Sequence, residues 1–172
     1  DELNAGDLLM VAKNNYYWGS ENKELDFIAN GDVAVVRRMR RVREMYGFRF
    51  ADVVLTFPDY DDLELEVKVL LDTLHSDTPA LTREQSEHLF NAVQEDYKDI
   101  TVKRERMKKL KEDPYYNALQ VKYAYAVTCH KAQGGQWKHV FIDQGYMTED
   151  MLTPDYFRWL YTAFTRATET LY

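Results

Sequence analysis

Residues 126–137 read AVTCHKAQGGQW, and residues 159–167 read WLYTAFTRA. Both runs set polar, hydrogen-bonding side chains into patterns that are otherwise apolar strand or helix. Around them, the sequence predicts a strand over residues 117–127, a short buried strand at Val140–Asp143, and a helix that starts at Thr153-Pro154 and continues to Thr168. Strand, polar turn, strand, helix and a final strand are typical of an α/β unit with a parallel sheet. Because broken local patterns concentrate at functional sites, the two runs indicate one.

The polar turn directly follows the predicted strand that ends at Val127. Ligands bind at the carboxyl ends of strands in such sheets, and Gly134 and Gly135 would let the backbone approach an anion closely. On spacing alone, an ordinary polar turn with a helix cap explains these residues equally well. Arg166 lies late in the predicted helix, where most arginines are solvated, but its small neighbours leave room for a planar contact with a phosphate.

The two runs also carry a family resemblance. Residues 128–134 (TCHKAQG) match the pattern Thr-x-His-Lys-x-Gln-Gly, and residues 161–167 (YTAFTRA) match Tyr-x-Ala-x-Thr-Arg-Ala. In this order, with a strand between them, they resemble motifs V and VI of RecD-like superfamily 1 helicases, the exodeoxyribonuclease V alpha subunit and its relatives. Residues 6–32 are similar to the segment by which that group enters a small β-barrel inserted in the second motor half.

The resemblance implies an ATP-dependent DNA helicase that couples hydrolysis of ATP, with Mg²⁺, to movement along single-stranded DNA and unwinding of duplex DNA. It further implies 5′ to 3′ movement and a role in DNA repair or recombination. Arg166 would be the arginine finger that stabilises charge on the γ-phosphate. Many relatives have a glutamate where this chain has Gln136, so no charged contact to the ribose is implied there. The remaining implied roles are nucleotide-proximal for Gln133, Gly134, Gly135 and Gln136, and DNA binding and coupling for Thr128, His130 and Lys131.

Other parts of an ATPase are absent from the sequence. No Gly-x4-Gly-Lys-Ser/Thr occurs, so the chain has no P-loop to hold phosphates and magnesium. We therefore expect a fragment that is inactive alone, binds no metal or nucleotide by itself, and works with a missing N-terminal motor domain. Nuclease subunits are further candidate partners. The alternative from another class is a non-catalytic module that binds nucleic acid or protein and carries vestigial helicase motifs.

Upstream of the motifs the pattern changes twice. Short β-branched runs joined by turns predict an SH3-like β-barrel over residues 1–75, with a hairpin at Asn30-Gly31. Residues 76–116 predict a helical connector that opens with a Thr82/Gln85 capping box. Residues 117–172 would be the C-terminal portion of the second RecA-like domain. The expected fold is therefore mixed α/β: a small barrel, a connector and part of a motor domain.

Charge and composition set limits on these readings. The 172 residues carry a net charge of −7, which argues against wholesale non-specific binding of nucleic acid. Strand alternation would place Arg37, Arg41 and Arg43 on one face, as candidate contacts to a DNA backbone. The acidic residues between 59 and 66 are interpreted as a turn and a solvated strand face, without a metal site. The single cysteine is typical of a reducing cytoplasm, and no run is apolar enough to span a membrane.

Overall fold

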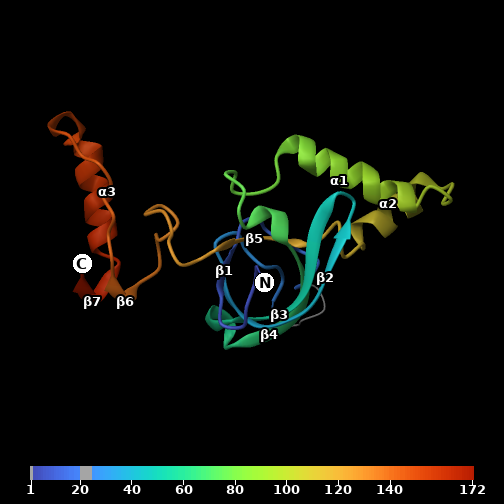
Figure 1. Ribbon diagram of the computed structural model, residues 1–172, viewed down its shortest axis with the longest axis horizontal. Coiled ribbons are helices and arrows are strands. Elements are labelled where there is room, and N and C mark those ends of the chain that lie inside the picture. The colour runs from blue at the N-terminus through green and yellow to red at the C-terminus, as the bar shows by residue number, and fades with distance from the viewer. Residues whose placement is uncertain (1, 20–24) are drawn as a thin grey trace. The chain divides into compact units, whose positions relative to one another are not determined.

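The computed structural model describes residues 2–19 and 25–172. It divides into two compact units, Asp1–Tyr125 and Ala126–Tyr172. The first contains a barrel with two helices and the second contains one helix with a small sheet (Figure 1). The described part of the chain is thus mixed α/β with three α-helices, and none of them is long and apolar enough to cross a membrane.

The first unit is built on a closed five-stranded barrel. Its strands follow one another around the barrel in chain order, and the fifth pairs with both the fourth and the first. The pairing with β1 is antiparallel and the pairing with β4 is parallel. A barrel is confirmed, but its fifth strand lies outside residues 1–75, where the sequence predicts the whole barrel. Its strands are β1 (Leu8–Val11), β2 (Val33–Met45), β3 (Phe48–Phe57), β4 (Leu63–Leu70) and β5 (Leu119–Tyr123).

The strand β5 lies in a different place from the one expected. The sequence predicts a strand at residues 117–127 in the motor-like segment, whereas the structure has Leu119–Tyr123 as the strand that closes the barrel. Leu119 and Val121 are fully buried in the barrel core. Thr73 secures the strand, because its Oγ1 donates to Val121 O at 2.9 Å and accepts from Val121 N at 3.1 Å. A local pattern identifies a strand but not its partner, and the pairing of β5 with β1 joins residues more than a hundred positions apart.

The β2–β3 hairpin turns at Tyr46 and Gly47, whose φ angles are +58° and +77°. Positive φ at both positions is the type I′ geometry that matches the twist of a two-residue hairpin. The hairpin predicted at Asn30-Gly31 is wrong. Gly31 does turn the chain, with φ +104°, but Ile28 forms only an isolated bridge with Asn15. The edge of β2 that such a hairpin needs is already paired with β1.

Two helices cover a second hydrophobic cluster on the barrel surface. Helix α1 (Arg83–Asp96) buries Leu89 and Val93, and α2 (Lys103–Lys111) buries Leu110, against Phe48 and Phe50 of β3. Between β3 and β4, and again after β4, the chain makes single turns of 3₁₀-helix, η1 (Pro58–Tyr60) and η2 (Leu71–Thr73). Residues 76–116, predicted to be helical, thus contain the helices α1 and α2.

A buried carboxylate holds the chain together after α2. Asp113 accepts hydrogen bonds from the backbone N–H groups of Tyr115 and Tyr116 and from the hydroxyl of Tyr97. Burial, followed by this hydrogen bond, raises the pKa of Tyr97 to about 12. These contacts tie the end of α1 to the segment that leads into β5.

The predicted capping box of α1 is confirmed and gives a stability prediction. Thr82 Oγ1 accepts from Gln85 N at 3.2 Å, and Gln85 Oε1 accepts from Thr82 N at 2.9 Å. Thr82→Ala removes one of these bonds and should lower the free energy of unfolding by about 1 kcal/mol, measured by urea denaturation. Thr101→Ala is the control. Thr101 directly precedes Val102, the N-cap of α2, and this helix has no side-chain cap. Equal effects of the two substitutions would contradict the capping role.

The second unit joins two short parallel strands through one helix. Strand β6 (Trp137–Val140) pairs with β7 (Ala167–Leu171), and α3 (Pro154–Phe164) lies between them in sequence, preceded by the 3₁₀ turn η3 (Glu149–Met151). The strand predicted at Val140–Asp143 is displaced toward the N-terminus, and none of its residues is buried in the unit. Helix α3 ends four residues before the predicted Thr168, because β7 pairing begins at Ala167.

Candidate functional site

Residues 128–135 form a compact series of turns in the second unit. The carbonyl of Thr128 accepts from Ala132 N at 3.1 Å, and the Thr128 hydroxyl accepts from Lys131 N at 3.4 Å. Ala132 O then accepts from Gly135 N at 3.2 Å. Apart from the Thr128 hydroxyl, these bonds join backbone groups, so they do not involve the side chains of His130, Lys131 and Gln133. The predicted polar turn therefore exists as a defined local structure.

Arg166 fastens this turn to the end of α3. Its Nε donates to Thr162 O at 3.0 Å, its Nη1 donates to Gly135 O at 3.1 Å, and its Nη2 donates to Thr165 Oγ1 at 2.9 Å. The carbonyl of Arg166 also accepts from Trp137 N at 2.9 Å. Both the side chain and the backbone of Arg166 thus hold the segment that follows the two glycines, and the two sequence motifs meet at this residue.

The guanidinium retains capacity for a ligand. Its bonds to Thr162, Gly135 and Thr165 use three of its five N–H groups. The remaining two belong to Nη1 and Nη2, the planar pair that binds phosphate oxygens in a bidentate manner. The side chain is half-buried, which reduces screening by water and strengthens an interaction with an anion.

Local geometry favours glycine at both positions of the turn. Gly134 has φ +87°, in the left-handed region that L side chains avoid. A Cβ at Gly135 would overlap the Trp137 ring. This gives the Gly134-Gly135 pair a structural reason, close packing against β6, besides the phosphate approach suggested by the sequence.

An open pocket lies between the turn and α3. Its volume is about 350 Å³, and the turn contributes Cys129, His130 and Gln133 to its lining. The Cys129 thiol donates to Trp159 O at 3.5 Å, which joins its two walls. The pocket thus brings together one residue predicted to couple to DNA and one predicted to lie near the nucleotide. The helix contributes Asp155, Arg158, Trp159 and Thr162.

The sequence analysis missed these helix residues as part of the site. They recur every three or four positions, which places them on one face of α3. Arg158 is the notable omission, because its Nη1 donates to Asp155 Oδ1 at 2.7 Å beside the pocket. Their spacing relative to Arg166 was the signal that could have identified them. Residues three or four positions apart lie on the same face of a helix, so the residues that precede Arg166 at this spacing are candidates for the same site.

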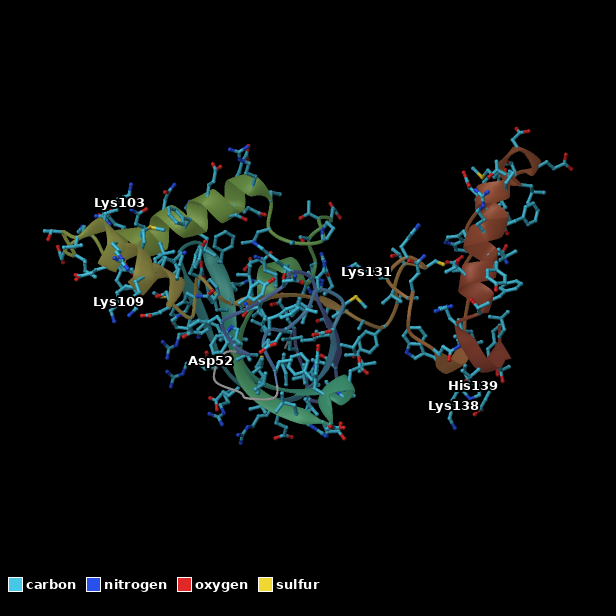
Figure 2. All side chains as sticks on the ribbon, turned by 180° about the vertical axis from the view of Figure 1, so that it is seen from behind. Asp52, Lys103, Lys109, Lys131, Lys138 and His139 are labelled. Atoms are coloured by element: carbon cyan, nitrogen blue, oxygen red, sulfur yellow. The ribbon has the colours of Figure 1, made fainter. Side chains whose placement is uncertain are left out.

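Other predicted residues lie outside this pocket. Thr128, Lys131 and Gln136 are exposed and do not line it. Figure 2 shows Lys131 on the turn, apart from α3. Over the described residues, no group of three or more His, Cys, Asp and Glu side chains is placed to hold a metal ion.

The predicted arginine face on β2 lies along an irregular strand. Two register shifts interrupt the pairing with β3, one between Val36 and Arg38 and one between Met39 and Arg41, so simple alternation fails. Arg37, a predicted phosphate contact, donates to Thr56 Oγ1 at 2.8 Å and lies 3.6 Å from Glu64. Its charge is therefore already paired. Arg41 and Arg43 remain exposed on the strand.

Two comparisons with known proteins bear on identity. No curated protein matches the chain. Residues 123–172, which contain the turn, Arg166 and α3, match the family model described as the UvrD-like helicase C-terminal domain. The matched segment includes both motifs and the whole of the second unit. Residues 123–172 are thus similar to the C-terminal part of a superfamily 1 helicase.

Proposed function

We propose that this chain is the C-terminal part of a RecD-like, ATP-dependent DNA helicase that moves along single-stranded DNA and unwinds duplex DNA in repair or recombination. One observation carries the proposal: Arg166, in the second motif, is hydrogen-bonded to Gly135, the residue that directly follows the first. Two motifs separated by about 30 residues then act as one unit. The family match over residues 123–172 supports the same function.

In this proposal Arg166 is the arginine finger. The two N–H groups that Thr162, Gly135 and Thr165 leave available would contact the γ-phosphate as negative charge develops on it. Holding the guanidinium by backbone carbonyls fixes its orientation beforehand, which removes a rotamer cost at the moment of reaction. Gln133, Gly134, Gly135 and Gln136 would line the nucleotide side of the turn.

ATP and Mg²⁺ are the expected cofactors of the complete enzyme. Bound Mg²⁺ would neutralise charge on the β- and γ-phosphates. This chain fits the phosphate side of that site through Arg166, but its described residues include no cluster of metal ligands. We infer that the P-loop and the magnesium-binding acids belong to another motor domain, and that the second unit is part of a RecA-like domain facing it.

Coupling to DNA is assigned to Thr128, His130 and Lys131. The turn that presents them is bonded through Gly135 to Arg166, so a change at the phosphate side would move the DNA side with it. His130 lines the pocket against α3, where a shift of the turn would change its surroundings. We place the enzyme in the cytoplasm, with nuclease subunits as candidate partners and movement from 5′ to 3′.

The complete enzyme and the 172-residue chain together test this function. The complete enzyme should hydrolyse ATP faster when single-stranded DNA is added, and should displace a strand from duplexes with a 5′ overhang. The chain alone should do neither, because it lacks a P-loop. A complete protein without a P-loop, or one with no DNA-stimulated turnover, would favour the non-catalytic binding module.

A further inference from the structure

The two bulges in β2 create a regular row of arginines. In the register with β3, Arg38 lies opposite Val54, Arg41 opposite Asp52 and Arg43 opposite Phe50. Residues directly opposite each other share a face of the sheet, and these partners are alternate residues of β3. The three arginines therefore project from the outer face of the barrel, where Phe50 also contacts the helix-covered cluster. Without the bulges, Arg38 and Arg41 would lie on opposite faces.

The acidic residues on this face are already occupied. Glu64 pairs with Arg37 and Glu66 pairs with Arg40. Asp52, which lies opposite Arg41, forms its ion pair with the buried Lys68. The bulge residues Arg37 and Arg40 thus pair with Glu64 and Glu66, and Lys68 of β4 pairs with Asp52.

Three positive charges in the row therefore lack an acidic partner. Across the described ranges 2–19 and 25–172, no ion pair joins Arg38 or Arg41 to a carboxylate, and Arg43 donates to the neutral hydroxyl of Tyr115 at 3.1 Å. All three side chains are exposed. In a chain of net charge −7, a row of unpaired cations indicates a local anionic ligand.

The row continues toward α2 through Tyr115. The Lys68 ammonium lies 4.4 Å from the centroid of the Tyr115 ring, whose hydroxyl accepts the hydrogen bond from Arg43. Figure 2 shows Asp52 on the side of the barrel where α2 presents Lys103 and Lys109. The last turn of α2 also exposes Lys111, and Lys108, which pairs with Glu112.

We propose that Arg38, Arg41 and Arg43 form a track for the phosphate backbone of single-stranded nucleic acid on the outer face of the barrel. Neighbouring members are two β3 residues apart, about 7 Å at a rise of about 3.4 Å per residue. A straight row suits an extended strand, whose phosphates follow one line, better than a duplex, whose phosphates wind around an axis. The choice of nucleic acid as the ligand rests on the proposed function, whereas the row of unpaired charges is observed independently of it.

Binding by the 172-residue chain tests the track directly. Fluorescence anisotropy with a labelled oligothymidylate should show that R38A/R41A binds about tenfold or more weakly than the wild type. The slope of log affinity against log salt should fall by about 1.4, twice the ~0.7 expected for one contact to a single strand. R83A/K98A is the matched control, because it removes two exposed cations that are each paired with a glutamate of α1.

Three outcomes would overturn the track. The first is equal weakening of oligothymidylate binding in both double variants. The second is no measurable binding of the oligothymidylate by the wild type at low salt. The third is that R38A/R41A loses binding to anionic vesicles or to duplex DNA but not to the single strand. Unchanged thermal unfolding of R38A/R41A shows that any loss is not a folding defect, as expected for exposed side chains.

A second experiment separates this inference from the proposed function. In the complete enzyme, R38A/R41A should raise about tenfold the DNA concentration that half-maximally stimulates ATP hydrolysis, and should leave turnover at saturating DNA unchanged. If DNA stimulates the wild type and the double variant responds at the same DNA concentration, the track is wrong and the helicase proposal stands. If DNA stimulates neither protein, the helicase proposal itself fails.

Discussion

Replacing Arg166 by alanine is expected to reduce the DNA-stimulated ATPase of the complete enzyme by about 10³-fold. The loss should appear in turnover, because the guanidinium stabilises charge that develops only in the transition state. Affinity for a non-hydrolysable ATP analogue should change by less than about tenfold. Single-turnover hydrolysis and equilibrium binding of the analogue, measured on the same preparation, distinguish the two effects.

Arg166→Ala also removes the bond to Gly135 that holds the turn. Arg166→Lys addresses this complication, since lysine keeps the charge but cannot reproduce the planar pair of donors. We expect Arg166→Lys to remain impaired by about 10²-fold or more. Arg83→Ala, on the surface of α1, is the matched arginine control and should be fully active. Turnover near the wild-type level in Arg166→Ala would exclude the finger role.

Leu119→Ala should lower the free energy of unfolding of the barrel by about 2–5 kcal/mol. The side chain is fully buried in the barrel core, so the smaller residue leaves a cavity among close-packed neighbours. Urea denaturation measures the effect. Trp18 packs against this core, so it reports on the barrel alone in a W137F/W159F background that silences the tryptophans of the second unit.

The control for Leu119→Ala is Val42→Ala, on the exposed part of β2. Its side chain is 48% exposed, so its truncation should change stability by less than about 0.5 kcal/mol. If Leu119→Ala unfolds no more readily than this control, β5 does not belong to the barrel core, and the strand would return to the motor-like segment where the sequence alone puts it.

Features set by neighbouring residues were predictable from the sequence. The Thr82 capping box needs only two residues three positions apart, and the turn at Tyr46-Gly47 lies between two β-branched runs. Features set by distant residues were not. The partners of β5 are β1 and β4, which the local pattern of residues 117–127 cannot specify. The Asn30-Gly31 signal was strong, but competition from β1 for the same strand edge decided the pairing.

The candidate site divides in the same way. Thr128, Gln133 and Arg166 were predicted because their order along the chain matches known motifs, and the structure joins the two runs through the bond from Arg166 to Gly135. The arginines opposite regular positions of β3 were only partly predicted. Alternation selected Arg37 and missed Arg38, because bulges carry no sequence signal comparable to that of a tight turn.

Closing the barrel with its first and last strands constrains how the protein is made. During synthesis, β1 leaves the ribosome more than a hundred residues before β5, and the sheet has two open edges throughout that interval. Open edges are sites of wrong pairing between nascent chains. Helices α1 and α2 emerge first and can cover Phe48 and Phe50, which leaves only the β1 and β4 edges unprotected. Chains truncated before residue 119 should therefore aggregate, whereas chains that extend past residue 123 should stay dispersed.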